Sequence, residues 1–428
     1  MTAEIVEVRG RRVWDSRGRP TVEVEVALDG GARGRAIAPA GASTGTGEAV
    51  DLRDGGAAFG GLDVRRALGG VAREIAPMLL GRDARDQAGI DRALIELDGT
   101  ENKARLGGNA VIATSMAVLH AAAAAGGVPL WRLCAGDRPV SIPVPEIQIF
   151  GGGAHAARRV DIQDFMVVCP SAGSFAEALD RTAEVYRAAG RLLAARGAIQ
   201  GVADEGGYWP AFGSNEEGLE LLVRAIEAAG LTPGEDAAIS LDIAASTFGS
   251  GGRYRLALED RELDSDGLIE LLGRWIDTYP IVSIEDPLAE DDEQGFRRFT
   301  DAYGSRLQVI GDDFLVTKAA RVEAAAASGA CNAVLIKPNQ AGTVTETKAA
   351  LEAGKACGFR TIVSARSGET EDVTIAHLAV GWDAGQFKVG SFTRSERMAK
   401  WNEMLRIEEA LGDRSRFATP FAAAPGRG

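Results

Sequence analysis

The second half of the chain repeats short apolar runs, and each run ends in a charged side chain or is followed closely by one. Along the sequence these runs read ISLDIAAS, IVSIEDP, LQVIGDD, AVLIKPN, TIVSARSGE and GQFKVG. After a first interval of 43 residues, successive charged residues lie roughly 22 to 29 residues apart, which accommodates one strand, one helix and two loops. This rhythm predicts an α/β barrel of alternating strands and helices.

The charged residues at the ends of these runs are expected to meet, because the C-terminal ends of parallel barrel strands open onto one face. They are Asp242, Glu285, Asp312, Lys337, Arg366 and Lys388. A single charge after a strand is typical of a surface residue or a helix cap. Six charges in the same phase instead favour one shared site, in which three carboxylates hold a metal beside a base and an anion clamp.

The first third of the chain predicts a smaller domain of another kind. Residues from Ile5 to about Leu28 alternate between apolar and polar, which is typical of antiparallel strands with one face in water. A loop of small residues, Pro39 to Glu48, leaves room for the backbone to approach a ligand. Helical patterns then run from Gly61 to about Gly127. We therefore expect an N-terminal α+β domain at residues 1–135, followed by the barrel at residues 136–428.

Other features of the sequence bear on where the protein works. The most apolar stretch, Ala110 to Trp131, is rich in alanine and contains polar residues, so it predicts a packed core helix rather than a membrane span. The first residues lack the apolar segment of a secretory signal, which favours the cytoplasm. The four cysteines are scattered without metal-binding spacing and fit reduced thiols.

The charge balance restricts the class of partner. A net charge of −14 argues against nucleic acid, which binds basic surfaces. It does not exclude a small anionic substrate, because a bound divalent cation inverts the local field. Asp242, Glu285 and Asp312 offer oxygen ligands without cysteine or histidine, a set that suits Mg²⁺ better than Zn²⁺. Helix capping is the alternative for each of them.

Candidates for proton transfer complete the pattern. Lysine is rare, and two of the seven, Lys337 and Lys388, fall at predicted strand ends. A partly desolvated lysine near cations loses its proton more easily and can act as a base, although a salt-bridged surface lysine is the alternative. The turn containing Glu205 offers a general acid, unless it is an ordinary acidic turn. His155 lies in a glycine-rich loop and is the one histidine we expect to be functional. Together these groups predict proton abstraction beside a carboxylate, followed by loss of hydroxide.

Longer segments resemble the enolase family, and the resemblance covers nearly the whole chain. They are VWDSRGRPTVEVEV, PAGASTGTGEAVDLRDG, TENKARLGGNAV, AAAAAGGVPLWR, ADEGG, ISLDIAAS, VSIEDPLAEDD, GDDFLVT, LIKPNQAGTVTET, RSGETED and RSERMAKWNEMLRIEEALGD. The resemblance implies a hydro-lyase with an enolase-type (β/α)8-like barrel after a smaller α+β domain. It also implies two Mg²⁺ ions per active site, a small anionic phosphorus-containing substrate, and assembly as a homodimer or a multiple of dimers.

The resemblance also implies a role for individual residues. Asp242, Glu285 and Asp312 match the ligands of the first Mg²⁺, and Ser43 matches the lid residue that closes onto the second. Lys337 matches the base and Glu205 its acid partner. The residues that match substrate contacts are Lys388 at the carboxylate, Arg366 and Ser367 at the phosphoryl group, and His155 and Gln163 at the second lid and beside it.

Two departures from the family pattern concern the substrate. The family reads SHRSGET where this chain has Ala365, which removes a hydrogen-bond donor and leaves space beside the phosphoryl group. The family reads QEF where this chain has Asp164, whose carboxylate sits about 1.5 Å further back. Such changes make sense if the substrate is bulkier at phosphorus, as for the carboxyphosphonoenolpyruvate synthases of phosphinothricin-type antibiotic pathways.

Three functions are therefore weighed. We expect dehydration of a 2-phosphoglycerate-like acid modified at phosphorus, which would belong to phosphonate or phosphinate biosynthesis. The alternative is the ordinary enolase reaction, 2-phosphoglycerate to phosphoenolpyruvate. A non-catalytic enolase-fold binding protein is the third, and the retained metal ligands, Lys337, Glu205 and Ser43 speak against it.

Overall fold

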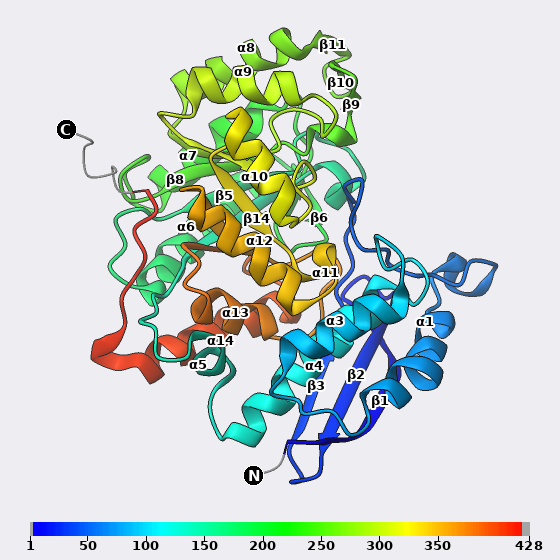
Figure 1. Ribbon diagram of the computed structural model, residues 1–428. Coiled ribbons are helices and arrows are strands. Elements are labelled where there is room, and N and C mark those ends of the chain that lie inside the picture. The colour runs from blue at the N-terminus through cyan, green and yellow to red at the C-terminus, as the bar shows by residue number, and fades with distance from the viewer. Residues whose placement is uncertain (1–2, 422–428) are drawn as a thin grey trace.

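The computed structural model of the protein describes residues 3–421 and has two parts, a three-stranded sheet with its helices and an eight-stranded barrel (Figure 1). The short Ala/Pro/Gly-rich end falls at residues 422–428, which lie outside the described residues, as do residues 1–2. The arrangement confirms the predicted fold class, an α/β barrel preceded by a smaller α+β part.

The first part is built on an antiparallel sheet of β1 (Ile5–Trp14), β2 (Pro20–Leu28) and β3 (Arg33–Ile37), in that order. One face packs on helix α4 (Gly108–Gly126). The other face carries charged side chains that pair across the strands, such as Arg11 with Glu25 at 3.3 Å. The alternation predicted the antiparallel strands correctly, but β2 lies between β1 and β3 and is buried at nearly every position, so the predicted face in water belongs mainly to β1.

Helix α4 lies unusually close to the sheet because small residues meet there. A β-carbon at Gly34 would lie 2.1 Å from the Ala121 backbone nitrogen, so only glycine fits opposite this alanine-rich helix. Among the described residues, α4 is the one helix long and apolar enough to cross a membrane, yet 83% of its apolar window is buried inside the protein. The prediction of a packed core helix is confirmed.

Shorter helices complete this part. Helix α3 shows how local sequence sets its bounds: Asp86 caps its start by accepting the Gly89 N–H at 3.0 Å, and Gly99 ends it at a φ of 70°. The elements in this region are η1 (Ala58–Gly61), α1 (Arg65–Gly70), η2 (Val71–Ile75), α2 (Ala76–Leu79), α3 (Gln87–Asp98) and α5 (Leu130–Ala135).

The barrel closes because its last strand pairs with its first. Seven strands run parallel, whereas β5 runs antiparallel to both of its neighbours. The N-terminal end of β5 therefore lies at the face where the other strands have their C-terminal ends. The strands are β4 (Val144–Gly151), β5 (Asp164–Val168), β8 (Ala238–Asp242), β12 (Ile281–Glu285), β13 (Gln308–Gly311), β14 (Ala333–Ile336), β15 (Arg360–Ser364) and β16 (Gln386–Gly390).

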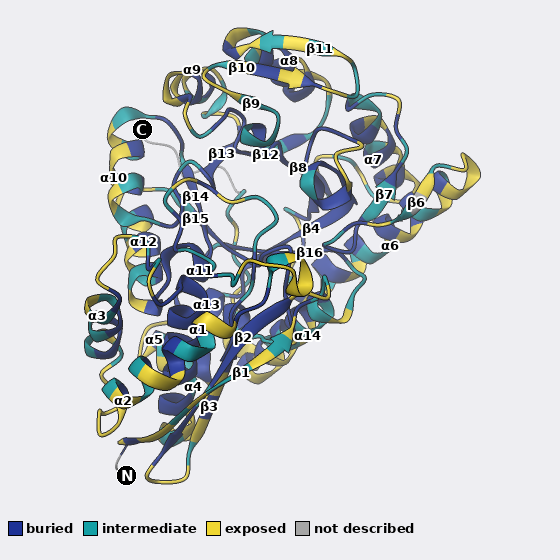
Figure 2. Ribbon diagram, turned by 90° about the vertical axis from the view of Figure 1, so that its right-hand side faces the viewer, coloured by how far each residue is buried: buried dark blue, intermediate teal, exposed yellow. Residues whose placement is uncertain are grey.

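Helices surround the barrel, and Figure 2 shows buried strands inside a ring of helices with exposed outer faces. Ser174 and Thr343 cap two of these helices by accepting backbone N–H groups three residues later, as the sequence signature of a cap requires. The helices are α6 (Phe175–Ala195), α7 (Glu216–Ala228), α8 (Ser265–Thr278), α9 (Glu293–Tyr303), α10 (Ala319–Ser328), α11 (Pro338–Ala341), α12 (Val344–Ala356), α13 (Thr374–Gly381) and α14 (Ser395–Leu411).

Two smaller strand units lie on the barrel. The hairpin of β6 (Ile199–Val202) and β7 (Tyr208–Pro210) pairs with β4, and its turn carries Glu205. A separate three-stranded sheet consists of β9 (Gly249–Ser250), β10 (Arg253–Leu256) and β11 (Arg261–Asp264). The remaining short elements are the 3₁₀ helices η3 (Gly153–Ala156), η4 (Ala245–Thr247) and η5 (Gly412–Arg414).

Candidate active site

The six charged residues predicted from the strand rhythm do meet at the mouth of the barrel. They come from six successive strands of the closed sheet, from β8 to β16, and none is more than 7% exposed. Asp242 and Glu285 are the last residues of their strands, and their Cα atoms are register partners. Asp312 and Lys337 follow β13 and β14 directly. The barrel topology thus concentrates buried charge of both signs in one place.

Lys388 neutralises two of the carboxylates. Its Nζ atom lies 3.0 Å from Asp242 Oδ2 and 2.8 Å from Glu285 Oε2. Burial alone would lower the pKa of Lys388, but the charges of Asp242 and Glu285 outweigh it and raise that pKa well above its usual value. Burial, aided by the charge of Asp242, raises the pKa of Glu285. Lys388 is therefore a fixed cation at the floor of the site.

Lys337 pairs with Asp312, because its Nζ atom donates to Asp312 Oδ2. Burial would lower the pKa of Lys337, yet the charge of Asp312 outweighs it and the pKa is raised. For a lysine that acts as a base near bound cations, the sequence predicts a lowered pKa instead. The difference arises because Asp312 is an ion-pair partner here, and a cation bound to that carboxylate would compete for it.

The carboxylates of Asp242, Glu285 and Asp312 suit Mg²⁺, which is the metal of the family that the sequence resembles. They supply hard oxygen ligands and no sulfur or nitrogen. Glu285 Oε1 is buried and has no hydrogen-bond partner among residues 3–421, as expected of a ligand atom. Asp242, Glu285 and Asp312 would hold the ion, and Asp242 and Ser43 border one cavity.

Two other groups bring possible ligand atoms within 4.8 Å of one another. His155, Asp164 and Glu205 form the first, but His155 bridges the two acids by hydrogen bonding and charge. Asp286, Asp312 and Asp313 form the second. Asp286 there accepts the backbone N–H groups of Asp312 at 2.9 Å and Asp313 at 2.8 Å, so it braces the loop after β13. We therefore favour the strand-end carboxylates as the ligands.

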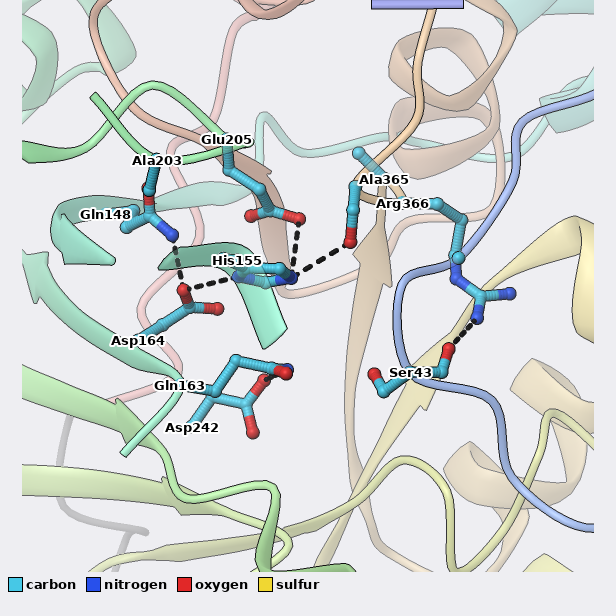
Figure 3. Close-up of polar contacts among 12 residues, drawn as sticks. Ser43, Gln148, His155, Gln163, Asp164, Ala203, Glu205, Asp242, Ala365 and Arg366 are labelled. Carbon is cyan, nitrogen blue, oxygen red and sulfur yellow. Dashed lines mark hydrogen bonds and ion pairs between the residues drawn. The ribbon is translucent and has the colours of Figure 1, made fainter. Parts of the chain in front are cut away.

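His155 links three predicted substrate or acid residues (Figure 3). Its Nδ1 lies 3.0 Å from Asp164 Oδ1, and its Nε2 lies 2.9 Å from Ser367 Oγ and 3.7 Å from Glu205 Oε1. Burial would lower the pKa of His155, but Asp164 and Glu205 outweigh it and raise the pKa to about 9. Burial opposes ionisation of Asp164, yet the charge of His155 and its hydrogen bond lower the pKa of Asp164 to about 2. At neutral pH the pair is an imidazolium and a carboxylate.

This shift predicts a pH-dependent stability. The pKa of His155 is raised from 6.5 to about 9 on folding, so its contribution is full below pH 6.5 and is lost as the pH rises through 9. The stability advantage of the wild type over His155→Gln should therefore shrink between pH 6.5 and 9.5 in urea unfolding without added Mg²⁺. His377→Gln is the matched control, because the pKa of His377 is lowered to about 4, mainly by burial. An advantage over His155→Gln that stays constant across this range contradicts the assignment.

Arg366 ties the predicted lid to the barrel. Its Nη2 donates to the Ser43 carbonyl at 3.0 Å, and its Nη1 donates to Glu48 Oε2 at 3.0 Å. Burial would lower the pKa of Arg366, but Glu48 and Asp312 raise it. The small-residue loop of residues 39–48 thus lies against the barrel-mouth residue Arg366, as the resemblance to the family implies for a lid, and Figure 3 shows Ser43 beside Arg366.

The remaining predicted residues line the same cavity. Gln163 Nε2 donates to Asp242 Oδ2 at 3.0 Å, while Gln163 Oε1 is buried without a partner in the described part of the chain. Ser367 and Ala365 follow β15 and are buried. Twelve residues border the cavity, which in this closed arrangement is only about 10 Å³: Ala42, Ser43, His155, Gln163, Glu205, Asp242, Lys337, Ser364, Ala365, Arg366, Ser367 and Lys388.

Some residues of the site were not predicted from the sequence. Glu48 pairs with Arg366, and Gln340 Nε2 donates to Asp312 Oδ1 at 2.9 Å. Gln148 donates to Asp164. An acidic residue ending a small-residue loop was a usable signal for Glu48. Buried glutamines carry no such signal, because their partners lie on strands and turns that only the fold brings together.

Comparisons with known proteins agree with this geometry. Residues 5–134 match the family described as the N-terminal domain of enolase, and residues 139–424 match the enolase C-terminal TIM barrel domain. The chain is also similar to a protein named Enolase 1 from Desulfitobacterium hafniense (strain Y51). The two are 50% identical over 426 residues, which cover 98% of each chain.

Proposed function

The chain belongs to the enolase family of carbon–oxygen lyases that use Mg²⁺, and on this premise we propose that it dehydrates 2-phosphoglycerate to phosphoenolpyruvate. The observation that carries the proposal is the 50% identity to a protein named Enolase 1 along the full length of both chains. The departures at Ala365 and Asp164 favour a substrate modified at phosphorus. The full-length match favours the ordinary reaction instead, and we take it as the main function.

The buried charges support a role for each residue in this reaction. Lys337 would remove the proton beside the substrate carboxylate, and Glu205, which borders the same cavity, would protonate the leaving hydroxyl. Lys388 would hold the carboxylate, while Arg366, Ser367 and His155 would bind the phosphoryl group. Mg²⁺, when bound by Asp242, Glu285, Asp312 and, for a second ion, Ser43, would stabilise the negative charge that develops.

The proposal extends to the organisation of the protein. We assign residues 1–135 to an N-terminal domain that carries the lid, and residues 136–428 to the barrel that carries the chemistry. We also propose a homodimer, or a multiple of dimers, in the cytoplasm, supported by membership of the family.

The product identifies the reaction directly. Incubation of the protein with 2-phosphoglycerate and Mg²⁺ should replace the substrate ³¹P resonance with that of phosphoenolpyruvate, and excess EDTA should stop the conversion. A non-catalytic binding protein would leave the substrate unchanged under both conditions. Such a result would overturn the proposed function.

Replacing Glu205 with glutamine should separate the two proton transfers. The amide cannot donate an acidic proton to the leaving hydroxyl, so dehydration should fall by about 10²–10⁴-fold. Exchange of the substrate α-proton with deuterium oxide should continue, because Lys337 is untouched. Mass spectrometry of recovered substrate measures this exchange. Equal loss of exchange and dehydration would show that Glu205 is not the acid for the second step alone.

A second candidate function rests on Ala365. This residue borders the cavity with a methyl side chain next to Arg366 and Ser367, the proposed phosphoryl contacts. A carboxyl group attached to phosphorus, as in the substrate of carboxyphosphonoenolpyruvate synthases, would be less crowded beside this methyl group than beside the imidazole that the family has there. The reaction would be the same dehydration on a larger substrate.

Ala365→His tests whether this space matters. The imidazole should fill it and lower kcat/KM on the carboxylated analogue by about ten- to a hundredfold more than on 2-phosphoglycerate. Asp164→Glu, which is expected to lower the turnover of both substrates, should add a smaller shift of their ratio in the same direction. The measurement is the ratio of kcat/KM on the two substrates, compared between the variants and the wild type. A ratio that Ala365→His leaves unchanged would remove the second candidate.

A further inference from the structure

We propose that Gln148 is a positioning residue, which is fixed by the turn carrying Glu205, holds the Asp164 carboxylate against that turn and thereby orients His155. The inference rests on the proposed function, because it concerns how that site is held. Gln148 lies on β4 and is not among the residues that border the cavity, and Figure 3 shows it beside Asp164.

Gln148 uses both ends of its side-chain amide on different elements. Its Nε2 donates to Asp164 Oδ1 at the start of β5. Its Oε1 accepts the backbone N–H of Gly207 at 2.8 Å, at the end of the turn after β6. An amide can donate to a carboxylate at one end and accept from a backbone N–H at the other. Since the residue is completely buried, a partner left without its hydrogen bond would destabilise this arrangement.

The contact reaches the cavity through Asp164. The oxygen that Gln148 contacts is the one that receives His155 Nδ1 at 3.0 Å, and the other carboxylate oxygen lies 3.7 Å from Lys388 Nζ. His155 in turn contacts Ser367 and Glu205 at its opposite nitrogen. A displacement of the Asp164 carboxylate therefore turns the imidazole relative to two residues that border the cavity.

The surrounding backbone leaves the amide little freedom. A β-carbon at Gly207 would lie 2.5 Å from Gln148 Oε1, and one at Gly151 would lie 3.3 Å from Gln148 Nε2. The turn and the end of β4 thus pack directly against the amide, which fixes its orientation.

Other contacts hold the turn independently of Gln148. The Ser391 N–H donates to the Glu205 carbonyl at 2.9 Å, and the Tyr186 hydroxyl donates to the Gly206 carbonyl at 3.1 Å. The turn should therefore keep its place when Gln148 is replaced. The loss should fall on the orientation of Asp164 and His155.

Reciprocal changes of side-chain length test this geometry by rescue. Gln148→Asn withdraws the amide by about 1.5 Å, and Asp164→Glu extends the carboxylate by the same amount. Each single variant should lower kcat on 2-phosphoglycerate by about ten- to a hundredfold, with KM changed by less than about threefold. The double variant should return to within about threefold of the wild-type kcat. A double variant no better than the worse single variant would overturn the proposal.

A second readout needs no substrate. The chain has three histidines, so ¹⁵N-histidine NMR resolves His155, and His155→Gln assigns its signals. Gln148→Met keeps the side-chain length and removes both hydrogen bonds, so it should shift the His155 Nδ1 and Nε2 resonances. Gln386→Met is the control, because it removes another fully buried amide, one that accepts from Gln308, and should leave those resonances in place.

The two readouts separate the inference from the proposed function. His155 resonances that do not move in Gln148→Met overturn the positioning role, whatever the activity. Shifted resonances in a protein that leaves 2-phosphoglycerate unchanged support the positioning role, while the proposed function fails.

Discussion

Replacing Lys337 with alanine should remove the exchange of the substrate α-proton with solvent deuterium and lower kcat on 2-phosphoglycerate by about 10²–10⁴-fold or more. Lys337 is buried, follows β14 directly, and borders the cavity that Glu205 also borders. Alanine leaves no group that could take the proton. The backbone N–H of Lys337, which donates to Thr317 Oγ1 at 3.0 Å, is unaffected by the change, so the loop should keep its conformation.

Lys348→Ala provides the matched control for this prediction. Its ammonium group is exposed and pairs with Glu352 at 3.4 Å on the surface of α12, so both exchange and turnover should stay at the wild-type level. Exchange is followed by mass spectrometry of recovered substrate. Exchange that persists in Lys337→Ala would assign the base to another residue.

Replacing Glu285 with glutamine should weaken Mg²⁺ binding by at least about tenfold, because a charged hard ligand becomes neutral. Turnover at fixed Mg²⁺ should fall by about a hundredfold or more, since the cation stabilises the developing charge. Glu285 is completely buried, and one of its oxygens has no partner in the described part of the chain. The other oxygen contacts Lys388, so the variant also leaves that ammonium with less negative charge nearby.

Titration calorimetry with Mg²⁺ measures the first effect without substrate. Glu262→Gln on strand β11 is the control. Glu262 is exposed, so its replacement removes one negative charge outside the buried metal site. Unchanged Mg²⁺ affinity in Glu285→Gln would remove Glu285 from the set of metal ligands.

The sequence predicted the barrel side of this site well, for a physical reason. A parallel barrel places one end of every strand on the same face, so the phase of Asp242, Glu285, Asp312 and Lys337 along the chain became proximity in space. This prediction used only the spacing of these residues along the chain and did not depend on any individual contact. The composition of α4 also predicted a packed core helix rather than a membrane span. The packing of α4 against β2 and β3 agrees with this prediction.

Other parts of the site could not be derived from local pattern. Asp164 lies next to His155 because β5 runs against its neighbours, a reversal that alternation of apolar residues does not encode. Gln148 and Glu48 act through partners on other elements, and the ion pair of Glu48 with Arg366 spans most of the chain. Without a bound cation the pKa of Lys337 is raised, because the Asp312 side chain lies at hydrogen-bond distance, and the sequence does not show this contact.

The central claim is that this chain is an enolase acting on unmodified 2-phosphoglycerate, and the most direct test is kcat/KM of the wild type at saturating Mg²⁺. We expect at least about 10⁵ M⁻¹s⁻¹ on 2-phosphoglycerate, the range of an efficient enzyme. The analogue with a carboxyl group on phosphorus should be at least about tenfold poorer. Efficient turnover of the analogue, with kcat/KM on 2-phosphoglycerate about a thousandfold or more below the expected value, would contradict the claim and assign the protein to the larger substrate.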